Sequence, residues 1–389
     1  MTPEARIATA AELLDAILQG QPAEQALTTW ARRSRFAGSK DRAAIRDHVF
    51  DALRCRRSYA YLGGAEEGRA LMLGHLIAQG IDPKTVFTGQ GHAPSELTED
   101  ELARAKPLDV LSDAPEAVAG DMPDWLWPLL RDALGDDTPA VADRLRHRAP
   151  VFLRVNLAKT DVATAQASLT SEGIDTQPHS LADTALEVTS GARQVARSRA
   201  YMDGWVELQD AASQAVTAAL PLSNGMKVLD YCAGGGGKTL SMAGRVKAEF
   251  TAHDANRARL NDLPDRARRA GVQVRIDAAP KGPYDLILCD VPCSGSGSWR
   301  RSPEGKWALT PDRLADLTAI QSDILSKTAP MVAPGGTLAY ATCSLLRAEN
   351  EERIAQFLHT HPDWQMTMDR RWSPLDGGDG FFLACLTRA

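Results

Sequence analysis

Two cysteines lie at positions where a thiol could act as a nucleophile. Cys293 lies in LILCDVPCSGSGS and Cys343 in LAYATCSLLRAENE, and each follows an apolar run that is typical of a buried strand. Buried cysteines are usually inert packing residues, which is how we interpret Cys289 and Cys385. Serine, glycine or charged residues follow Cys293 and Cys343. These two thiols are therefore our candidates for nucleophilic chemistry.

A run of four glycines offers the second chemical feature, in VLDYCAGGGGKT at 228–239. A phosphate-binding P-loop has the pattern G-x-x-x-x-G-K-[ST]. Five positions before Gly237 the chain has Cys232, so the first glycine of that pattern is missing. The sequence therefore argues against a phosphate cradle at this loop.

The alternative is a site for an adenosyl group, because glycines let the backbone approach a nucleoside closely. Such a site needs an acid after the second strand to bind the ribose hydroxyls, and Asp254 in FTAHDANRARL stands there. Asp277 in VRIDAAP follows the next strand, where it could contact the adenine amine. Asp290 could hydrogen-bond the target base or border the cofactor. Ordinary turns are the competing interpretation of the loop. The candidate cofactor residues are Cys232, Ala233, Gly234, Gly235, Gly236, Gly237, Lys238, Asp254, Asp277 and Asp290.

These residues follow strands in a region of regular alternation between strand and helix patterns, which we assign to residues 204–389. The alternation predicts a parallel sheet covered by helices on both faces, with ligands outside the carboxyl ends of the strands. The predicted strands are 226–230, 249–253, 272–276, 284–289 and 337–342, and the helices are 237–246, 256–270, 311–329 and 347–359.

Two smaller regions precede this one. Residues 1–148 show helical spacing of apolar residues with a loose linker at 81–124, which predicts an all-α domain. Residues 149–203 show a strand at 151–155, a helix and two short strands, the β-α-β-β order of half a ferredoxin-like sandwich. Small sheets of this RRM-like kind often bind RNA.

Composition limits the remaining classes of function. The 389 residues include six cysteines, too sparse for a disulfide framework and without the spacing of a zinc site, so we expect no metal. We find neither a secretory signal nor a membrane-spanning run, and expect a cytoplasmic monomer. The net charge of −6 argues against indiscriminate nucleic-acid binding, but cations cluster at 32–57, at 193–199 and at Arg300, Arg301 and Lys306. Each cluster alone is typical of a solvated helix face.

The motifs together resemble a known family. CAGGGGKT, DVPCSGSG and YATCSLLRAENE, with WVELQDAASQ before and GDGFFLACL after, resemble the RNA (cytosine-5) methyltransferases of the RsmB/Sun family over about 150–389. The helical N-terminus resembles that family's NusB-like RNA-binding domain. The resemblance implies a Rossmann-like class I methyltransferase sheet, S-adenosylmethionine as cofactor, and RNA as partner. Small-subunit ribosomal RNA is the first substrate expected and transfer RNA the alternative.

The resemblance also implies roles for both thiols. Cys343 would add to carbon 6 of cytosine, which makes carbon 5 nucleophilic enough to attack a sulfonium methyl, and Cys293 would assist product release. The family's usual Ala-Pro-Gly-Gly-Lys is replaced here by Gly234–Lys238, which predicts a more flexible loop and weaker cofactor binding. Two alternatives remain open: a DNA cytosine methyltransferase, in which the Pro-Cys thiol would attack, and a catalytically idle RNA-binding factor.

Overall fold

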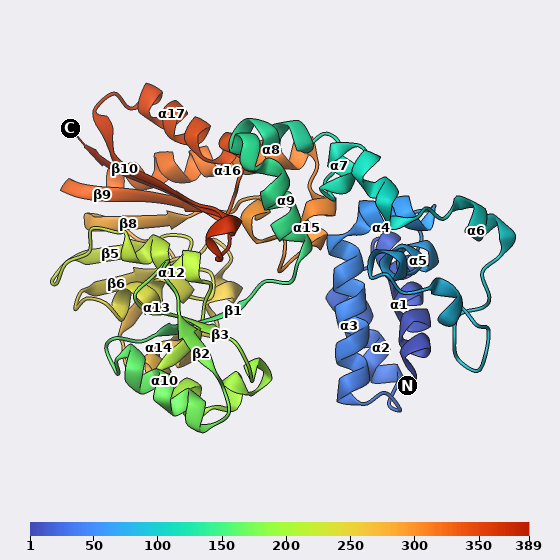
Figure 1. Ribbon diagram of the computed structural model, residues 1–389. Helices are drawn as coiled ribbons and strands as arrows, with labels where there is room; N and C mark the ends of the chain where they lie inside the picture. The colour runs from blue at the N-terminus through green and yellow to red at the C-terminus, as the bar shows by residue number, and fades with distance from the viewer. Residues whose placement is uncertain (389) are drawn as a thin grey trace. The chain divides into compact units, whose positions relative to one another are not determined.

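The computed structural model describes residues 1–388, which form two compact units (Figure 1). We call them the helical unit, made of Met1–Arg148 and Trp299–Ala308, and the sheet unit, made of Ala149–Ser298 and the described residues from Leu309 on. The predicted catalytic region 204–389 is therefore interrupted, since Trp299–Ala308 packs with the helical unit. None of the helices among residues 1–388 is long and apolar enough to cross a bilayer.

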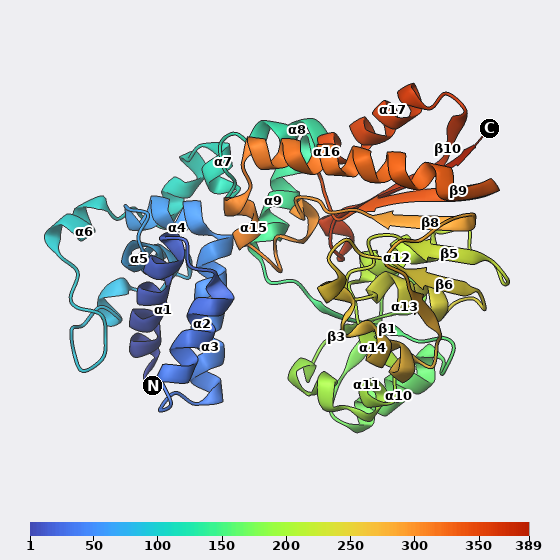
Figure 2. The ribbon, with the colours of Figure 1, turned by 180° about the vertical axis from the view of Figure 1, so that it is seen from behind.

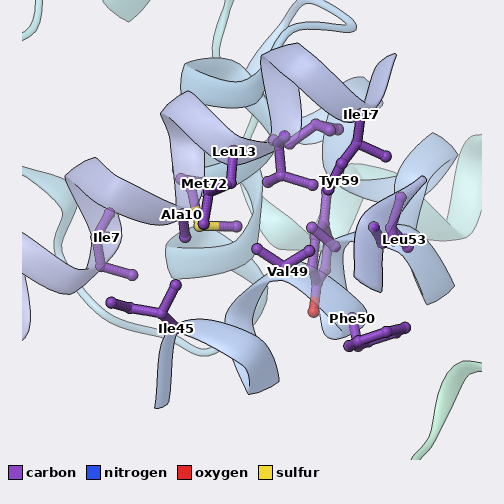
Figure 3. Packing of buried hydrophobic residues seen from close by; sticks show 14 of the residues in the cluster. Ile7, Ala10, Leu13, Ile17, Ile45, Val49, Phe50, Leu53, Tyr59 and Met72 are labelled. Carbon is purple, nitrogen blue, oxygen red and sulfur yellow. The ribbon is translucent and has the colours of Figure 1, made fainter. Parts of the chain in front are cut away.

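The helical unit is built on an apolar core. Ile45 and Val49 lie one turn apart on the same helix, and both are fully buried in one cluster with Leu14 and Met72 of two other helices. Figure 3 shows Val49 and Met72 in this cluster. The segment 81–124, predicted to be a loose linker, contains only short helices and 3₁₀ turns. The helices are α1 (Pro3–Leu18), α2 (Ala23–Arg33), α3 (Ser39–Arg54), α4 (Arg56–Gly63), α5 (Gly68–Ala78), α6 (Glu99–Arg104), α7 (Glu116–Ala119), α8 (Trp127–Leu134), α9 (Thr138–Arg146) and α15 (Glu304–Ala308), with 3₁₀ turns η1 (Pro83–Thr85), η2 (Leu108–Asp113) and η3 (Gly135–Asp137).

The sheet unit begins with a small antiparallel sheet in the order β2-β3-β1-β4. Its fourth strand pairs Val206 with Val155 and Leu208 with Leu153, so this sheet extends beyond the predicted boundary at 203. A three-residue strand is too short to show an alternating pattern, which is why the sequence did not reveal it. The elements are β1 (Val151–Val155), α10 (Val162–Ser171), β2 (Thr176–Pro178), β3 (Ala185–Val188), η4 (Ala192–Arg197), α11 (Arg199–Met202) and β4 (Val206–Leu208).

A seven-stranded sheet in the order β10-β11-β9-β8-β5-β6-β7 forms the centre of the sheet unit. The strands from β5 to β9 are parallel, as predicted. Strand β11 runs antiparallel to both of its neighbours, β9 and β10, so the sheet as a whole is mostly parallel. Residues 373–380 connect β10 to β11, and a connection this short is possible because the two strands are antiparallel. The strands are β5 (Lys227–Asp230), β6 (Glu249–Ala252), β7 (Val274–Ile276), β8 (Tyr284–Asp290), β9 (Val332–Thr342), β10 (Trp364–Trp372) and β11 (Phe381–Arg388).

Helices cover both faces of this sheet, which confirms the predicted Rossmann-like fold. Alternate residues of β8 separate the two layers: Ile287 packs with Leu325 of α16, and Leu288 packs with Val216 of α12. Figure 1 shows α12 and α13 in front of the sheet, and Figure 2 shows α16 on the reverse side. The remaining elements are α12 (Ala211–Ala218), α13 (Gly237–Ala243), η5 (Arg257–Leu260), α14 (Leu263–Ala270), η6 (Ser296–Ser298), α16 (Pro311–Thr328), η7 (Ala329–Met331), η8 (Arg347–Glu349), α17 (Glu351–Thr360) and η9 (Pro374–Asp376).

Candidate catalytic site

The two candidate thiols meet at the carboxyl edge of the large sheet. Strands β8 and β9 are parallel neighbours with Asp290 opposite Ala341. Cys293 and Cys343 follow these residues by three and two positions, so the chain brings them side by side. Their Sγ atoms are 3.4 Å apart, and both side chains are partly exposed. Sequence spacing had placed both thiols at this edge but could not give the contact between them.

A buried polar cluster holds the two loops that carry the thiols. Glu349, fully buried, accepts hydrogen bonds from the Ser294 backbone amide at 2.8 Å and the Gln321 amide at 3.0 Å, and the Ser344 hydroxyl also donates to it. Gly297 donates from its backbone to the Cys343 carbonyl at 2.9 Å. Sequence reasoning missed Glu349, although it lies inside the quoted motif YATCSLLRAENE.

Charge distinguishes the two sulfurs. The hydrogen bond with Cys293 lowers the pKa of Cys343, and the ammonium of Lys238 lowers it further, while burial and Asp290 oppose them. The pKa of Cys293 is raised by the same hydrogen bond, by burial and by the carboxylate of Glu349. Lys238 itself pairs with Asp290, with 2.8 Å between Nζ and Oδ2. Cys343 is therefore the thiol that ionises first.

The glycine loop connects β5 to α13 at the same edge. Gly234 and Gly236 have φ angles of +53° and +80°, which L-residues with a side chain rarely adopt. A Cβ added at Gly236 would lie 2.3 Å from Leu263 Cδ1, so this position has no room for one. The loop is thus fixed by its backbone conformation and by contact with α14.

Asp254 follows β6 and supports this loop from beside it. Its Oδ2 accepts hydrogen bonds from the Gly234 amide at 2.9 Å and from Arg259 at 3.2 Å, and its Oδ1 accepts from the Asn256 amide at 2.9 Å. The predicted contact with ribose hydroxyls stays a prediction. The structure gives Asp254 a second role that the sequence did not predict, because its hydrogen bond with the Gly234 amide holds the glycine loop.

The other predicted cofactor residues lie along the same strand ends. Asp277 follows β7, accepts from the Ala279 amide at 3.0 Å and forms an ion pair with Arg275 at 3.4 Å. Cys232 and Ala233 follow β5, and burial raises the pKa of Cys232, so that thiol stays protonated. Strand register brings Asp230, Ala252 and Ile276 level with one another.

Asp230, the last residue of β5, is a further acid at this edge that is not among the predicted site residues. It is buried, and this burial raises its pKa to about 7. Its Oδ2 accepts from the Thr239 hydroxyl at 2.7 Å, but its Oδ1 accepts no hydrogen bond from the described residues. A buried carboxylate oxygen without a partner is costly, and such groups concentrate at functional sites.

The basic clusters separate into two kinds. Arg32, Arg33, Arg35 and Lys40 are exposed, as expected of a solvated face. Arg300 and Lys306 are each 1% exposed, so the solvated interpretation is wrong for them. Among residues 1–388, no group of three or more His, Cys, Asp or Glu side chains could hold a metal ion.

Comparison with known proteins identifies the family. The model of the 16S rRNA methyltransferase RsmB/F family matches residues 217–386, and that of the ferredoxin-like domain of RsmF/B-like methyltransferases matches 122–195. Ribosomal RNA small subunit methyltransferase B of Vibrio vulnificus is 33% identical over 72% of this chain and 70% of its own length. The protein of the same name from Citrobacter koseri is 33% identical over 68% and 66%. The chain belongs to the RsmB/F family.

As a member of the RsmB/F family, the chain is a methyltransferase. The fold agrees over the whole length: the crystal structure of PH0851 has a TM-score of 0.75 and 22% identity, covering 100% of this chain and 99% of that one. The matched segment spans about two thirds of the two curated relatives. The ferredoxin-like match begins at residue 122, within the helical unit, and ends at 195, before β4.

Proposed function

We propose that this RsmB/F family member transfers methyl from S-adenosylmethionine to carbon 5 of a cytosine in RNA, with small-subunit ribosomal RNA as substrate. The observation that carries the proposal is the pair of thiols 3.4 Å apart, of which Cys343 ionises first. One sulfur can attack a ring while the other remains protonated beside it. The names of the curated relatives supply the substrate class.

The acidic residues at the carboxyl edge of the large sheet complement the positive charges of this cofactor. S-adenosylmethionine carries a sulfonium and an ammonium group, and it supplies an electrophilic methyl group when bound. The edge presents four carboxylates, Asp230, Asp254, Asp277 and Asp290, and Asp230 Oδ1 has no partner among the described residues. We expect Asp254 to bind the ribose, Asp277 the adenine amine, and the backbone of Cys232–Lys238 the remainder.

The chain's own residues prepare the base for methylation. Carbon 5 of cytosine is a poor nucleophile, so Cys343 adds as thiolate to carbon 6, and the electrons of the 5,6 double bond become available at carbon 5. Lys238 favours the thiolate that this addition requires. We expect Asp290, which pairs with Lys238, either to hydrogen-bond the base near its ring nitrogen or to border the cofactor. The base must leave its stack to arrive there, at a cost of a few kcal/mol.

Release reverses the addition. Once carbon 5 carries the methyl group, its proton passes to water at the partly exposed thiols, the 5,6 double bond re-forms, and the bond between carbon 6 and Cys343 Sγ breaks with its electrons going to the sulfur. Cys293 assists this step, because its thiol stays protonated close to the leaving sulfur. The products are 5-methylcytosine, S-adenosylhomocysteine, a proton and a free Cys343 thiolate.

Each cysteine variant should fail differently. Cys343→Ala should abolish methylation, because no covalent bond to the ring can form. Cys293→Ala should accumulate a covalent protein–RNA adduct, visible as a band that survives denaturing electrophoresis. The adduct appearing instead with Cys343→Ala would reverse the two roles, as in a DNA cytosine methyltransferase.

The helical unit offers a surface for RNA. Arg32, Arg33, Arg35 and Lys40 are exposed and form no ion pair within residues 1–388, and Phe36 among them is 76% exposed. Cations bind phosphates and an exposed aromatic ring can stack on a base. We therefore assign RNA binding to residues 1–148 and 149–203, and methyl transfer to 204–389, in a cytoplasmic monomer. Bisulfite sequencing of ribosomal and transfer RNA from cells lacking the protein would locate the cytosine.

A further inference from the structure

One pair of thiols is in direct contact in the sheet unit. All six cysteines of the chain are free, and within residues 1–388 only Cys293 and Cys343 have their sulfurs in contact, at 3.4 Å. Both side chains are partly exposed, so a small molecule can reach them. The sulfurs of a disulfide are about 2.05 Å apart, so this pair is close to the separation that a covalent bond requires.

The protein's own hydrogen bonds keep the two sulfurs together. Ser294 directly follows Cys293, and Ser344 directly follows Cys343. The buried carboxylate of Glu349 accepts from the Ser294 backbone amide at 2.8 Å and from the Ser344 hydroxyl. A single side chain therefore holds both loops at positions adjacent to the thiols. The contact between the sulfurs is a property of the folded sheet unit.

The two thiols differ in their readiness to react with an oxidant. Peroxides oxidise thiolates, and not protonated thiols. The hydrogen bond with Cys293 lowers the pKa of Cys343, and the ammonium of Lys238 lowers it further. The same hydrogen bond raises the pKa of Cys293, as do burial and the negative charges of Cys343 and Glu349. Cys343 should therefore be oxidised first, with a protonated thiol beside it.

The other four thiols are protected from oxidation. Burial raises the pKa of Cys289 and of Cys385 to about 12, and each is no more than 2% exposed. Burial also raises the pKa of Cys55, to about 11. Cys232 is partly exposed at the same edge of the sheet, but burial raises its pKa, and no other sulfur contacts it within the described residues. Cys232 is therefore a natural comparison for the reactive pair.

We propose that Cys293 and Cys343 form a reversible oxidation site that reacts with hydroperoxides, such as hydrogen peroxide, and closes as a disulfide. Disulfides of proteins in a reducing compartment are usually transient and redox-sensing, which fits a pair of this kind. Formation of the disulfide does not depend on the proposed function. Its consequence for catalysis does, because it rests on the assigned role of Cys343.

The reaction balances with the peroxide as the only oxidant. The Cys343 thiolate attacks one peroxide oxygen, the O–O bond breaks, and hydroxide leaves, so that Cys343 becomes a sulfenic acid. Cys293 gives its proton to that hydroxide and attacks the Cys343 sulfur, and the sulfur–oxygen bond breaks with loss of a second hydroxide. The two hydroxides take up the two protons that the thiols held. Two thiols and one hydrogen peroxide thus give one disulfide and two waters.

Oxidation of Cys343 also prepares Cys293 for its step. The negative charge of Cys343 is one of the causes that raise the pKa of Cys293, and a sulfenic acid does not carry it. The disulfide leaves no thiolate to add to a pyrimidine ring, so methylation stops. It also protects Cys343 from irreversible oxidation to the sulfinic acid. A dithiol such as dithiothreitol regenerates both thiols and becomes a disulfide itself.

Peptide mapping of the whole chain tests the oxidation site. The protein is treated with hydrogen peroxide, the remaining thiols are blocked with N-ethylmaleimide, and the digest is analysed by mass spectrometry. We expect a linked peptide pair containing Cys293 and Cys343, which dithiothreitol separates. Cys232 should stay reduced in the same sample, with oxidation at least roughly tenfold slower than that of Cys343, because it is protonated.

Two matched variants test the order of the steps. In Cys293→Ser the sulfenic acid has no neighbouring thiol, so dimedone, which labels sulfenic acids, should mark Cys343. In Cys343→Ser dimedone should leave Cys293 unmarked, because burial and Glu349 still raise its pKa. Labelling of Cys293 in that variant contradicts the assigned order. The absence of the linked peptide pair, or oxidation of Cys232 as fast as that of Cys343, overturns the oxidation site.

The same experiment separates this site from the proposed function. Disulfide formation needs neither RNA nor methyl donor. The oxidised protein should be unable to methylate RNA until dithiothreitol is added. Methylation that continues with the disulfide intact would support the oxidation site and contradict the catalytic role of Cys343, as would methylation that survives in Cys343→Ala.

Discussion

In the proposed mechanism, the hydrogen bond between two neighbouring sulfurs and the charges around them help to determine which of the two attacks. Lys238 is close enough to Cys343 to lower its pKa, and Glu349 acts on Cys293 in the opposite direction. The sequence identified both cysteines as candidate nucleophiles, because each follows an apolar run. Their difference in acidity was not, because Glu349 comes from a helical turn some fifty positions along the chain from Cys293.

Replacing Lys238 should therefore weaken catalysis in a pH-dependent manner. Lys238→Met keeps the buried stem and removes the charge that favours the Cys343 thiolate. We expect kcat near neutral pH to fall about tenfold, and the pH at which activity reaches half its maximum to rise. The pH profile of methylation checks this. A uniform fall in kcat at all pH values would show that Lys238 acts in another way.

Asp230 gives a prediction for stability. Burial raises its pKa to about 7 in the folded protein, above its ordinary value of 3.8, so the folded state holds this proton more tightly than the unfolded state. The contribution of Asp230 to stability is therefore greatest below about pH 4, falls as the pH rises towards 7, and is constant above that.

Asp230→Asn should remove this pH dependence, because an amide does not titrate. We expect its free energy of unfolding to exceed that of the unaltered chain by roughly 2–4 kcal/mol at about pH 8 and to differ little at about pH 4. Urea unfolding at both pH values measures the difference. An equal change at the two values would exclude titration of this carboxyl as the cause.

At the scale of elements, strands with apolar runs were predictable and short or peripheral strands were not. The strand at 151–155 is observed with those bounds, and the runs before Asp230 and Asp290 are strands β5 and β8. Strand β4 has three residues, and most of β10 is exposed, so neither has a clear apolar pattern. Their places in the sheets depend on pairing with strands far away in the sequence.

The glycine loop gives a matched pair of substitutions. Gly236→Ala should destabilise the protein by about 2 kcal/mol or more, because φ is +80° there and Leu263 occupies the position of the Cβ. Gly237→Ala should be close to neutral, because a Cβ there would meet only Gln209, at 3.8 Å. Thermal unfolding compares the two. Equal losses would mean that the loop conformation does not require glycine at 236.

At the scale of the whole molecule, the chain is two units with separate cores. The sequence predicts the end of the helical region at 148, because a strand pattern begins at 151. The return of Trp299–Ala308 to that unit could not, because Arg300 and Lys306 have the residue types of an exposed loop. Burial of such residues depends on partners, and the carbonyl that accepts from Lys306, that of Arg54, lies 252 positions earlier.

Ligand binding should distinguish the units in calorimetry. The residues expected to hold the cofactor all belong to the sheet unit, so S-adenosylhomocysteine should raise only one of two unfolding transitions. Ligand at a hundred times its Kd stabilises by about 2.7 kcal/mol. The Asp254→Ala variant, which lacks the expected ribose carboxylate, should lose this shift. A single transition that moves as a whole would contradict independent unfolding.

The helical unit is discontinuous in sequence, and this limits how the protein can be recombined. A hybrid that took residues 1–148 from a relative and kept the rest would combine the Leu53 and Arg54 positions of one protein with the Lys306 and Trp307 of another. The foreign helices would then receive caps that did not evolve with them. A working exchange of the amino-terminal portion must therefore transplant residues 299–308 as well, ten positions from the middle of the catalytic sequence.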